Sequence, residues 1–203
     1  PVKRLFVDQP IAAGSTLALE GAAAHYLGRV LRARVGNTVQ VFNGDGREFA
    51  AEMTRITRDA VVLDVHDAVA AAPEPRVAIT LMQALSRNEK MDLAIQKAVE
   101  LGVHSIRPVA VERSVMRLDD TRTARRTEHW QQVAVHAAQQ CGRAVVPEVH
   151  APATLGDALN ASADVGLGIV ADPQAAQSLG DCLDKAGDGV DAARLLVGPE
   201  GGL

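Results

Sequence analysis

The chain changes its hydrophobic pattern once, across the Ala/Pro-rich stretch AVAAAPEPR at residues 68–76. Before this stretch, short apolar–polar alternations are separated by turn residues, which is typical of half-buried β-strands. After it, continuous apolar runs alternate with helical patterns, which is typical of an α/β domain built on a parallel sheet. We therefore interpret residues 68–76 as a linker, and we expect two domains, at residues 1–70 and 71–203.

The first segment predicts a small, barrel-like all-β module. Its strongest signal is NTVQVFNGDGREFAAEMTRI, which alternates on both sides of the turn Asn43-Gly44-Asp45-Gly46. Such a turn between alternating runs indicates a β-hairpin. The runs RLFV, STLALE and AVVLDVHDAV supply further strands of the same kind.

The second segment predicts alternating strands and helices. VAITLMQAL reads as a strand buried on both faces. Ser86 and Glu89 have the spacing of a capping box, so we expect a helix to begin there and to end near Gly102. SIRPVAV, DVGLGIVAD and ARLLVG read as further strands. A second long helix is predicted by an apolar stripe that stops at Gly142 and consists of Trp130, Val133, Ala134, Ala137, Ala138 and Cys141.

Composition excludes several classes of function. No apolar run reaches the roughly 18 residues of a membrane-spanning helix, so we expect no membrane association. The start, PVKRLFVDQP, lacks the apolar core of a signal peptide. The two cysteines lack metal-ligand spacing, and neither HExxH nor the hydrolase elbow GxSxG occurs. We therefore expect a cytoplasmic protein with reduced cysteines and no metal.

Charge is distributed unevenly along the chain. The formal net charge is −4, but residues 151–203 hold two basic and eight acidic side chains, which leaves 19 basic and 17 acidic side chains in residues 1–150. A basic face for nucleic acid is compatible with this asymmetry, and so is an ordinary solvated surface. Only five aromatic residues are present, so RNA binding would depend on arginines and shape rather than on base stacking.

Two loops follow predicted strands of the second segment, VADPQA at residues 170–175 and VGPEGGL at residues 197–203. Ligands of open parallel sheets bind outside the carboxyl ends of the strands. The glycines of the second loop would let backbone N–H groups face a ligand directly. The same residues could form a simple turn, and they match neither a Walker loop nor GxGxxG.

Arginines gather in three places, and each group could contact phosphate or lie solvated at the surface. Arg29, Arg32 and Arg34 belong to YLGRVLRARVG in the β module, and Lys3 and Arg4 accompany them. The others follow a strand of the second segment or lead into its second helix, and they are Arg113, Arg117, Arg122, Arg125 and Arg126.

Four stretches occur together in a characteristic order: HYLGRVLRARVGNTVQVFNGDG, QALSRNEKMDLAIQKAVELGVHSIRPVAVERSV, HWQQVAVHAAQQCGRAVVPEV and LLVGPEGGL. With these motifs the chain resembles the bacterial methyltransferases that modify N3 of a uridine in small-subunit ribosomal RNA, which belong to the knotted SPOUT class. The resemblance spans nearly the whole chain. The combination of KMDxAIQKAxELGV, QQCGR and VGPEGG carries most of its specificity.

This resemblance implies a fold, a cofactor and partners. It implies a PUA-like, RNA-binding β-barrel at residues 1–70 and a SPOUT-type α/β domain with a trefoil knot at residues 71–203. It further implies S-adenosylmethionine as cofactor, small-subunit ribosomal RNA or the assembled 30S subunit as substrate, and a homodimer. Members of the family continue past the glycine loop with a segment that threads the knot, so the knot is expected to be incomplete in these 203 residues.

The resemblance also implies site residues. The loop that wraps the methyl donor corresponds to Gly198, Pro199, Glu200, Gly201, Gly202 and Leu203. A second cofactor loop corresponds to Ala171, Asp172 and Pro173. The basic positions expected to contact RNA are Arg4, Arg29, Arg32, Arg34, Lys90, Arg113 and Arg143. The chain departs from the family at His136 and Gln139, where acidic residues are frequent.

The implied reaction transfers a methyl group from a sulfonium to a ring nitrogen. Placing N3 in line with the methyl group, and stabilising the uridine oxyanion with an arginine, would both favour it. Glu200 is the one carboxylate of the glycine loop and is a candidate base, although a role in holding the loop by accepting backbone hydrogen bonds is favoured. Two alternatives remain open: a non-catalytic RNA-binding protein that docks through the β module, and a nucleotide-binding protein that uses GPEGG for phosphate.

Overall fold

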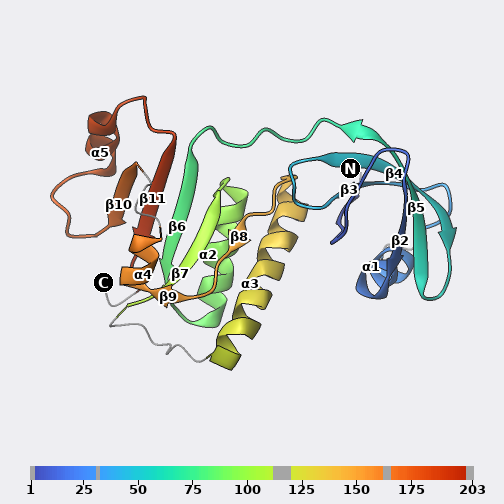
Figure 1. Ribbon diagram of the computed structural model, residues 1–203, viewed down its shortest axis with the longest axis horizontal. Helices are drawn as coiled ribbons and strands as arrows, with labels where there is room; N and C mark the ends of the chain where they lie inside the picture. The colour runs from blue at the N-terminus through green and yellow to red at the C-terminus, as the bar shows by residue number, and fades with distance from the viewer. Residues whose placement is uncertain (1–2, 31–32, 112–119, 162–165, 200–203) are drawn as a thin grey trace. The chain divides into compact units, whose positions relative to one another are not determined.

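The chain divides into two compact units. The first consists of Pro1–Pro73 together with Ala138–Val146, and the second consists of Glu74–Ala137 together with Pro147–Leu203. The computed structural model describes residues 3–30, 33–111, 120–161 and 166–199 (Figure 1). No local pattern in the sequence indicates that residues 138–146, which we call the returning segment, belong with the first unit.

The described part of the first unit holds one sheet, with strand order β1-β3-β4-β5-β2. β1 and β3 are parallel, and every other pair is antiparallel. A short helix, a π-helical turn and the strands have these bounds: β1 Arg4–Phe6, β2 Thr16–Glu20, α1 Gly21–His25, η1 Tyr26–Val30, β3 Thr38–Phe42, β4 Glu48–Ile56 and β5 Ala60–Val69.

Irregular pairing between β4 and β5 curls this sheet into a half-barrel. The register shifts between Phe49 and Ala51 and again between Met53 and Arg55. Each such irregularity increases the local twist and bends the strand. The concave side encloses a buried apolar cluster that includes Leu27 of η1. The predicted barrel-like β module is therefore confirmed.

The predicted hairpin is also confirmed, since the turn at residues 43–46 joins β3 to the antiparallel β4. Gly44 has a φ of +90°, and a Cβ at this position would lie 3.2 Å from the side chain of Val146. Val145 forms β-bridges with Gly44 and Asp45. Glycine at this turn therefore allows the returning segment to pack directly against the backbone of the hairpin.

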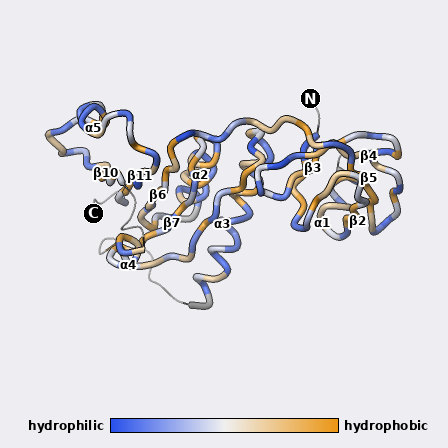
Figure 2. Tube along the Cα trace, turned by 45° about the horizontal axis from the view of Figure 1, so that its top comes forward, coloured by the Kyte–Doolittle hydropathy of each residue, from blue (hydrophilic) through white to orange (hydrophobic). Residues whose placement is uncertain are grey.

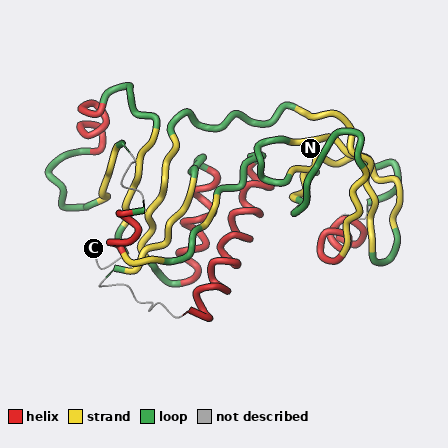
Figure 3. Tube along the Cα trace, in the orientation of Figure 1, coloured by secondary structure: helices red, strands yellow, loops and turns green. Residues whose placement is uncertain are grey.

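The second unit is a parallel sheet flanked by helices (Figure 3). Its strand order over the described residues is β10-β11-β6-β7-β8, and β9 also pairs with β7. The elements have these bounds: β6 Ala78–Ala84, α2 Asn88–Glu100, β7 Ser105–Ala110, α3 Asp120–Cys141, β8 Glu148–Val149, β9 Ala153–Thr154, α4 Leu155–Asn160, β10 Leu167–Ala171, α5 Leu179–Ala186 and β11 Ala192–Val197. The predicted α/β class is confirmed.

Helix α2 begins later than the sequence predicts. The amide N–H groups of Lys90 and Met91 both donate to the carbonyl oxygen of Arg87, so the first turn closes on Arg87. Arg87 is the N-cap, and no side chain caps it. The predicted capping box of Ser86 and Glu89 is therefore wrong, because the extended residue that precedes the helix is Arg87 and not Ser86. The predicted end is right, since the last helical turn closes at Leu101.

Helix α3 follows its predicted apolar stripe except at Cys141, which is exposed because it lies in the last turn. Trp130 is 2% exposed, and Ala134 and Ala138 are fully buried. The amino-terminal half of the helix is mainly hydrophilic (Figure 2). Gly142 follows the last turn with a φ of +94°, as the predicted stop requires. Neither α3 nor any other helix in the described ranges is long and apolar enough to cross a membrane.

Two short strands, β8 and β9, pair with β7, and a proline of β7 lies between the two places of pairing. Ser105 and Ile106 pair with β8, and Val109 and Ala110 pair with β9. Pro108 lies between these pairs and has no N–H to donate. Its position explains why β8 and β9 are two short strands rather than one continuous strand.

Candidate functional site

One in-register row of residues lies at the carboxyl edge of the parallel sheet. Ala171 of β10 pairs with Val197 of β11, Val197 pairs with Gln83 of β6, and Gln83 pairs with Pro108 of β7. We call these four residues the edge row. Because neighbouring parallel strands end side by side, the loop after Ala171 and the loop after Val197 start next to each other. The structure thus brings the beginnings of both predicted ligand loops together.

The loop after β10 is an ordered turn. The side-chain Oδ1 of Asp172 accepts a hydrogen bond of 2.9 Å from the N–H of Gln174, and its carbonyl oxygen accepts one of 3.1 Å from Ala175. Asp172 and Pro173 are exposed. Their position at the edge therefore leaves both residues accessible to a ligand.

The loop after β11 is described only at its start. Gly198 and Pro199 are half-buried beyond the last strand residue. The predicted cofactor residues Glu200, Gly201, Gly202 and Leu203 lie outside the described residues, as does the predicted catalytic role of Glu200. The trefoil knot also stays a prediction.

Buried packing beneath the edge row holds the strand ends in place. Met82 and Ala84 of β6 and Leu196 of β11 form one apolar cluster with Val109 of β7. Ala158 of α4 completes this cluster and is 2% exposed. These residues alternate along their strands with the edge row, so they face the opposite side of the sheet. The ends of β6, β7 and β11 are therefore supported from below by a closely packed core.

Gln83 is the polar side chain of the edge row, and the sequence predictions did not include it. It is 9% exposed, and its Nε2 donates to the carbonyl oxygen of the adjacent Ala84 at 3.2 Å. The available signal was a single amide within the apolar run VAITLMQAL, where a polar side chain needs a partner.

Arg4 faces the interior of the first unit. Its Nε and Nη2 bond the two carboxylate oxygens of Glu48 at 2.7 and 3.0 Å. Nη1 donates to the carbonyl oxygens of Ala138 and Gln139, and Nη2 also donates to that of Arg143. All five guanidinium N–H groups are thus used within the protein. The structure gives Arg4 a structural role and leaves no donor for an RNA phosphate.

The other predicted RNA contacts fall in different environments. Arg143 is 7% exposed, so its side chain belongs to the interior of the first unit. Arg34 is exposed, and its N–H donates to Oδ1 of Asn37 at 2.8 Å, which fixes the local turn. Arg29 is exposed near the end of η1, and Lys90 is exposed on α2. Arg32 and Arg113 lie outside the described residues.

The chain departs from the family at Gln139 and His136, and only Gln139 makes a contact that supports the fold. Oε1 of Gln139 accepts a hydrogen bond of 3.0 Å from the backbone N–H of Phe6, so it helps to hold β1. His136 is exposed and has no interaction within the described chain. Across the same residues, no group of three histidine, cysteine or carboxylate side chains could hold a metal ion.

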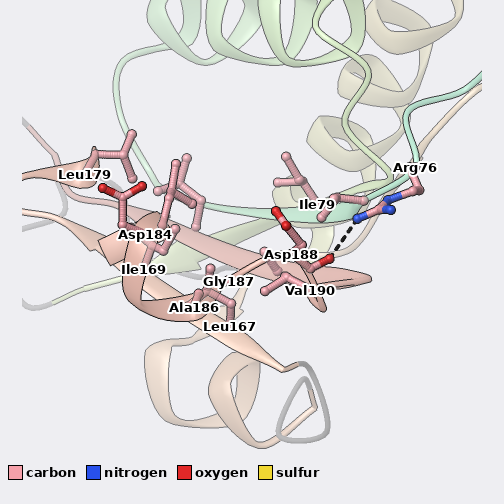
Figure 4. Close-up of a pocket in the computed structure, with 14 residues that line it drawn as sticks. Arg76, Ile79, Leu167, Ile169, Leu179, Asp184, Ala186, Gly187, Asp188 and Val190 are labelled. Carbon is pink, nitrogen blue, oxygen red and sulfur yellow. Dashed lines mark hydrogen bonds between the residues drawn. The ribbon is translucent and has the colours of Figure 1, made fainter. Parts of the chain in front are cut away.

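A separate cavity of about 700 Å³ lies between α5 and the sheet (Figure 4). Apolar side chains such as Ile79, Leu167 and Leu179 line it, and Arg76 closes one end by donating to the carbonyl oxygen of Asp188 at 2.9 Å. Its lining includes residues that precede β6 and β11, so it extends toward the amino ends of the strands. It contains no residue of the edge row, and it is not the candidate site.

Sequence comparison identifies both parts of the chain. A family model described as RNA methyltransferase domain matches residues 73–203. The chain belongs to this RNA methyltransferase family. A second family model, described as RNA methyltransferase PUA domain, matches residues 19–65. The predicted resemblance to methyltransferases of small-subunit ribosomal RNA is thereby confirmed.

Solved structures support the same assignment. The ribosomal RNA small subunit methyltransferase E of Neisseria gonorrhoeae, bound to S-adenosylmethionine, is 31% identical with a TM-score of 0.91, and the match covers 100% of this chain and 81% of that chain. A Legionella pneumophila protein in complex with bound S-adenosylmethionine is 30% identical with a TM-score of 0.90, and the match covers 100% of this chain and 82% of that chain.

Among curated proteins, this RNA methyltransferase chain is 26% identical over 151 residues to the ribosomal RNA small subunit methyltransferase E of Buchnera aphidicola. The match covers 74% of this chain and 60% of that relative. The ribosomal RNA small subunit methyltransferase E of Bacillus subtilis is 29% identical to this chain, and the match covers 73% of this chain and 59% of that relative. The match therefore spans about three fifths of the length of these two relatives.

Proposed function

We propose that this protein transfers a methyl group from S-adenosylmethionine to N3 of a uridine in small-subunit ribosomal RNA. In this proposal residues 1–70 bind RNA and residues 71–203 bind the cofactor. Support comes from the family match and from solved relatives that carry S-adenosylmethionine. The observation that carries the proposal is the edge row, where two loops begin side by side at the carboxyl edge of a parallel sheet, the usual place of a ligand in such a fold.

The residues present at this edge fit the cofactor. The accessible turn after Ala171 and the half-buried Gly198 provide backbone groups, and the edge also holds the side-chain amide of Gln83. Such a mixture suits a ligand that has both an apolar body and polar groups. The residues proposed to hold the cofactor are Ala171, Asp172, Pro173, Gly198, Pro199, Glu200, Gly201, Gly202 and Leu203.

When bound, the cofactor supplies an electrophilic methyl group on a sulfonium. The protein's part is to orient the base, because alignment of N3 with the methyl group lowers the barrier without any covalent intermediate. N3 must also lose its proton to become a good nucleophile. We propose Glu200 as the group to test for this step. Unchanged turnover of Glu200→Gln would assign Glu200 to holding the loop instead.

The RNA contacts are proposed on the basic side chains that do not face the interior. Arg4 and Arg143 are left out, since the structure commits Arg4 to internal acceptors and buries Arg143. Arg29 and Arg34 are near a π-helical turn, a feature frequent at functional sites. The proposed contacts are Arg29, Arg32, Arg34, Lys90 and Arg113.

We further propose a cytoplasmic homodimer as the acting form. The proposed substrate, ribosomal RNA or the assembled 30S subunit, is found in the cytoplasm of bacteria. Sedimentation of the purified protein would test the dimer, and a monomer that remains active would remove this part of the proposal.

The proposed function is tested by titrating S-adenosylhomocysteine into the protein by calorimetry, and by incubating the protein with S-adenosylmethionine and either protein-free small-subunit RNA or 30S subunits. We expect saturable binding, and N3-methyluridine in nuclease digests analysed by mass spectrometry. RNA binding that falls steeply with salt, together with no cofactor binding, would instead indicate a non-catalytic RNA-binding protein.

A further inference from the structure

The first two turns of α3 carry a group of arginines that local helix chemistry does not favour. The helix begins at Asp120, and Arg122, Arg125 and Arg126 follow within its next six residues. The amino end of a helix carries a partial positive charge, which favours acidic side chains there and disfavours cations. The three arginines therefore do not help α3 to form.

The same arginines are also placed where their charges repel one another. Arg125 and Arg126 follow Arg122 by three and four positions, which makes them neighbours of Arg122 on one face of the helix, and like charges at these spacings are destabilising. Arg125 is exposed and Arg126 is half-buried, and neither forms a hydrogen bond or an ion pair with another described residue. This includes Glu128, although it follows Arg125 by only three positions. The described part of the chain thus leaves Arg125 and Arg126 without a counter-charge.

The next turn of α3 is fixed to the second unit. Trp130 is 2% exposed, and Oε1 of Gln131 accepts a hydrogen bond of 2.9 Å from the N–H of Val149. Nε2 of His129 lies 2.9 Å from Oδ2 of Asp92 in α2. The arginines therefore extend from a helix whose position is already set, so that a ligand need order only their side chains.

The amino end of α3 lies on the side of the sheet where the strands end. β7 and β8 are parallel, and α3 connects them in the sequence, so the helix runs back against the strand direction. Figure 1 shows the amino end of α3 on the same side of the second unit as β9, which pairs with Val109 and Ala110 at the carboxyl end of β7. The edge row lies at this end of the strands. An RNA whose uridine reaches the edge row therefore has its backbone on the same side of the sheet as the arginines.

We propose that Arg125 and Arg126 bind phosphate groups of the substrate RNA. This inference rests on the proposed function. A guanidinium presents a planar set of N–H donors that can bond two phosphate oxygens at once, and RNA supplies the negative charge that both side chains lack. Phosphate contacts fix the position of a nucleic acid without reading its sequence. Arg125 and Arg126 are thus positioning residues, which hold the RNA while the edge of the sheet holds the cofactor.

The double variant Arg125→Gln/Arg126→Gln tests this role, because it removes both charges and keeps residues that favour helix. Binding of protein-free small-subunit RNA is measured by filter retention at several salt concentrations. The slope of log affinity against log salt should become less steep by about 1.4 to 1.8, as the loss of two phosphate contacts predicts. The affinity for S-adenosylhomocysteine in calorimetry should not change. The midpoint of unfolding in urea should stay the same or rise, because repulsion and an unfavourable dipole contact are removed.

Lys185→Gln is the matched control. Lys185 is an exposed cation on α5, in the same unit, and it too forms no hydrogen bond or ion pair with another described residue. The single variant Arg125→Gln should lower the steepness of the salt dependence by about half as much as the double variant. Lys185→Gln should leave it unchanged. An equal effect of both single variants would trace the change to net charge and overturn the inference.

The other outcomes separate this inference from the proposed function. If the double variant binds RNA with the same affinity and the same salt dependence as the unmodified chain, the role of Arg125 and Arg126 is overturned and the methyltransferase stays in place. A loss of RNA affinity that accompanies an equal loss of stability overturns it as well, because the arginines would then support the fold. If the unmodified chain binds neither small-subunit RNA nor S-adenosylhomocysteine, the proposed function itself fails, and this inference fails with it.

Discussion

Arg4 and Glu48 form a charged pair whose side chains are only 13% and 5% exposed. The guanidinium also lies 4.5 Å from the centre of the Phe42 ring. Two charges removed from water are tolerated because each satisfies the other and the backbone carbonyls satisfy the remaining donors. Deleting one partner leaves the other charge buried and unpaired.

Arg4→Met should therefore lower the free energy of unfolding by about 3 kcal/mol or more. Chemical denaturation followed by circular dichroism measures this effect. The double variant Arg4→Met/Glu48→Met should regain much of the loss, since no unpaired charge remains. RNA affinity of the folded Arg4→Met protein should change little. A selective loss of RNA binding at unchanged stability would restore Arg4 to the RNA surface.

His150 gives the second unit a dependence on pH. Burial lowers the pKa of His150, and the charge of Arg107 lowers it further, while Glu148, 3.0 Å away, acts in the opposite direction. A lowered pKa means that the folded state favours the neutral ring. As the pH falls below about 6.5, the unfolded chain takes up the proton first, and unfolding becomes easier.

The unmodified chain should accordingly lose stability faster than His150→Gln between about pH 7 and pH 5. Urea unfolding at several pH values measures the two slopes. Carboxylates that do not contact His150 affect both proteins alike, so the difference between the slopes reports on His150 together with its contact to Glu148. Identical slopes would show that His150 has the same pKa in the folded and unfolded chains.

At the scale of elements, α5 depends on its amino-terminal cap. Ser178 and Asp181 form a capping box, in which each side chain bonds the other residue's backbone N–H. None of the residues of α5 is buried. Local bonds therefore contribute more to this helix than to α2 or α3, whose apolar stripes are covered.

Ser178→Ala should destabilise α5 locally by about 1 kcal/mol. Faster amide hydrogen exchange in residues 179–186, with little change in α2, would report this effect. The hydrogen bonds from Ser178 lower the pKa of Asp181. Protection of α5 should therefore weaken as the pH falls below about 4, where the carboxylate becomes protonated. Equal exchange in both proteins would contradict the capping role.

The periodicity of apolar residues predicted which helices and strands form. It did not predict where α2 begins, or that a strand would bury the polar side chain of Gln83. The stripe around Trp130 and the turn at residues 43–46 were sufficient because burial and turn chemistry are local properties. The start of α2 at Asn88 depends on how far β6 remains paired with its neighbour, which no local pattern records. The place of Gln83 in the edge row likewise depends on strand register, because Val197 and Pro108 become its neighbours only in the folded sheet.

At the scale of the whole molecule, the first unit is not continuous in sequence. The returning segment supplies three carbonyl acceptors to Arg4, a side-chain acceptor to Phe6 and β-bridges to the turn at Gly44. The linker pattern at residues 68–76 could not reveal this, because the contacts join residues separated by more than 100 positions. Positions such as Arg4 therefore could not be assigned from the sequence.

A fragment ending at residue 73 should be much less stable than one that also carries residues 138–146. We expect residues 1–73 alone to unfold at lower urea than the same residues joined to 138–146 by a flexible linker of about ten Gly/Ser residues. Arg4→Met should reduce the benefit of the added segment. Equal stability of the two fragments would show that the half-barrel does not need the returning segment.

The returning segment also sets the order of events during synthesis. A ribosome makes the chain from its amino end, and domains generally fold as they emerge. The half-barrel must wait until residue 146 has left the exit tunnel, by which time β6, α2 and β7 are already outside. During that interval the guanidinium of Arg4 lacks its three carbonyl acceptors, and the N–H of Phe6 lacks the side-chain acceptor of Gln139. The first unit therefore completes its folding only after part of the second unit has been made. Until then, the nascent chain is exposed to chaperones and proteases.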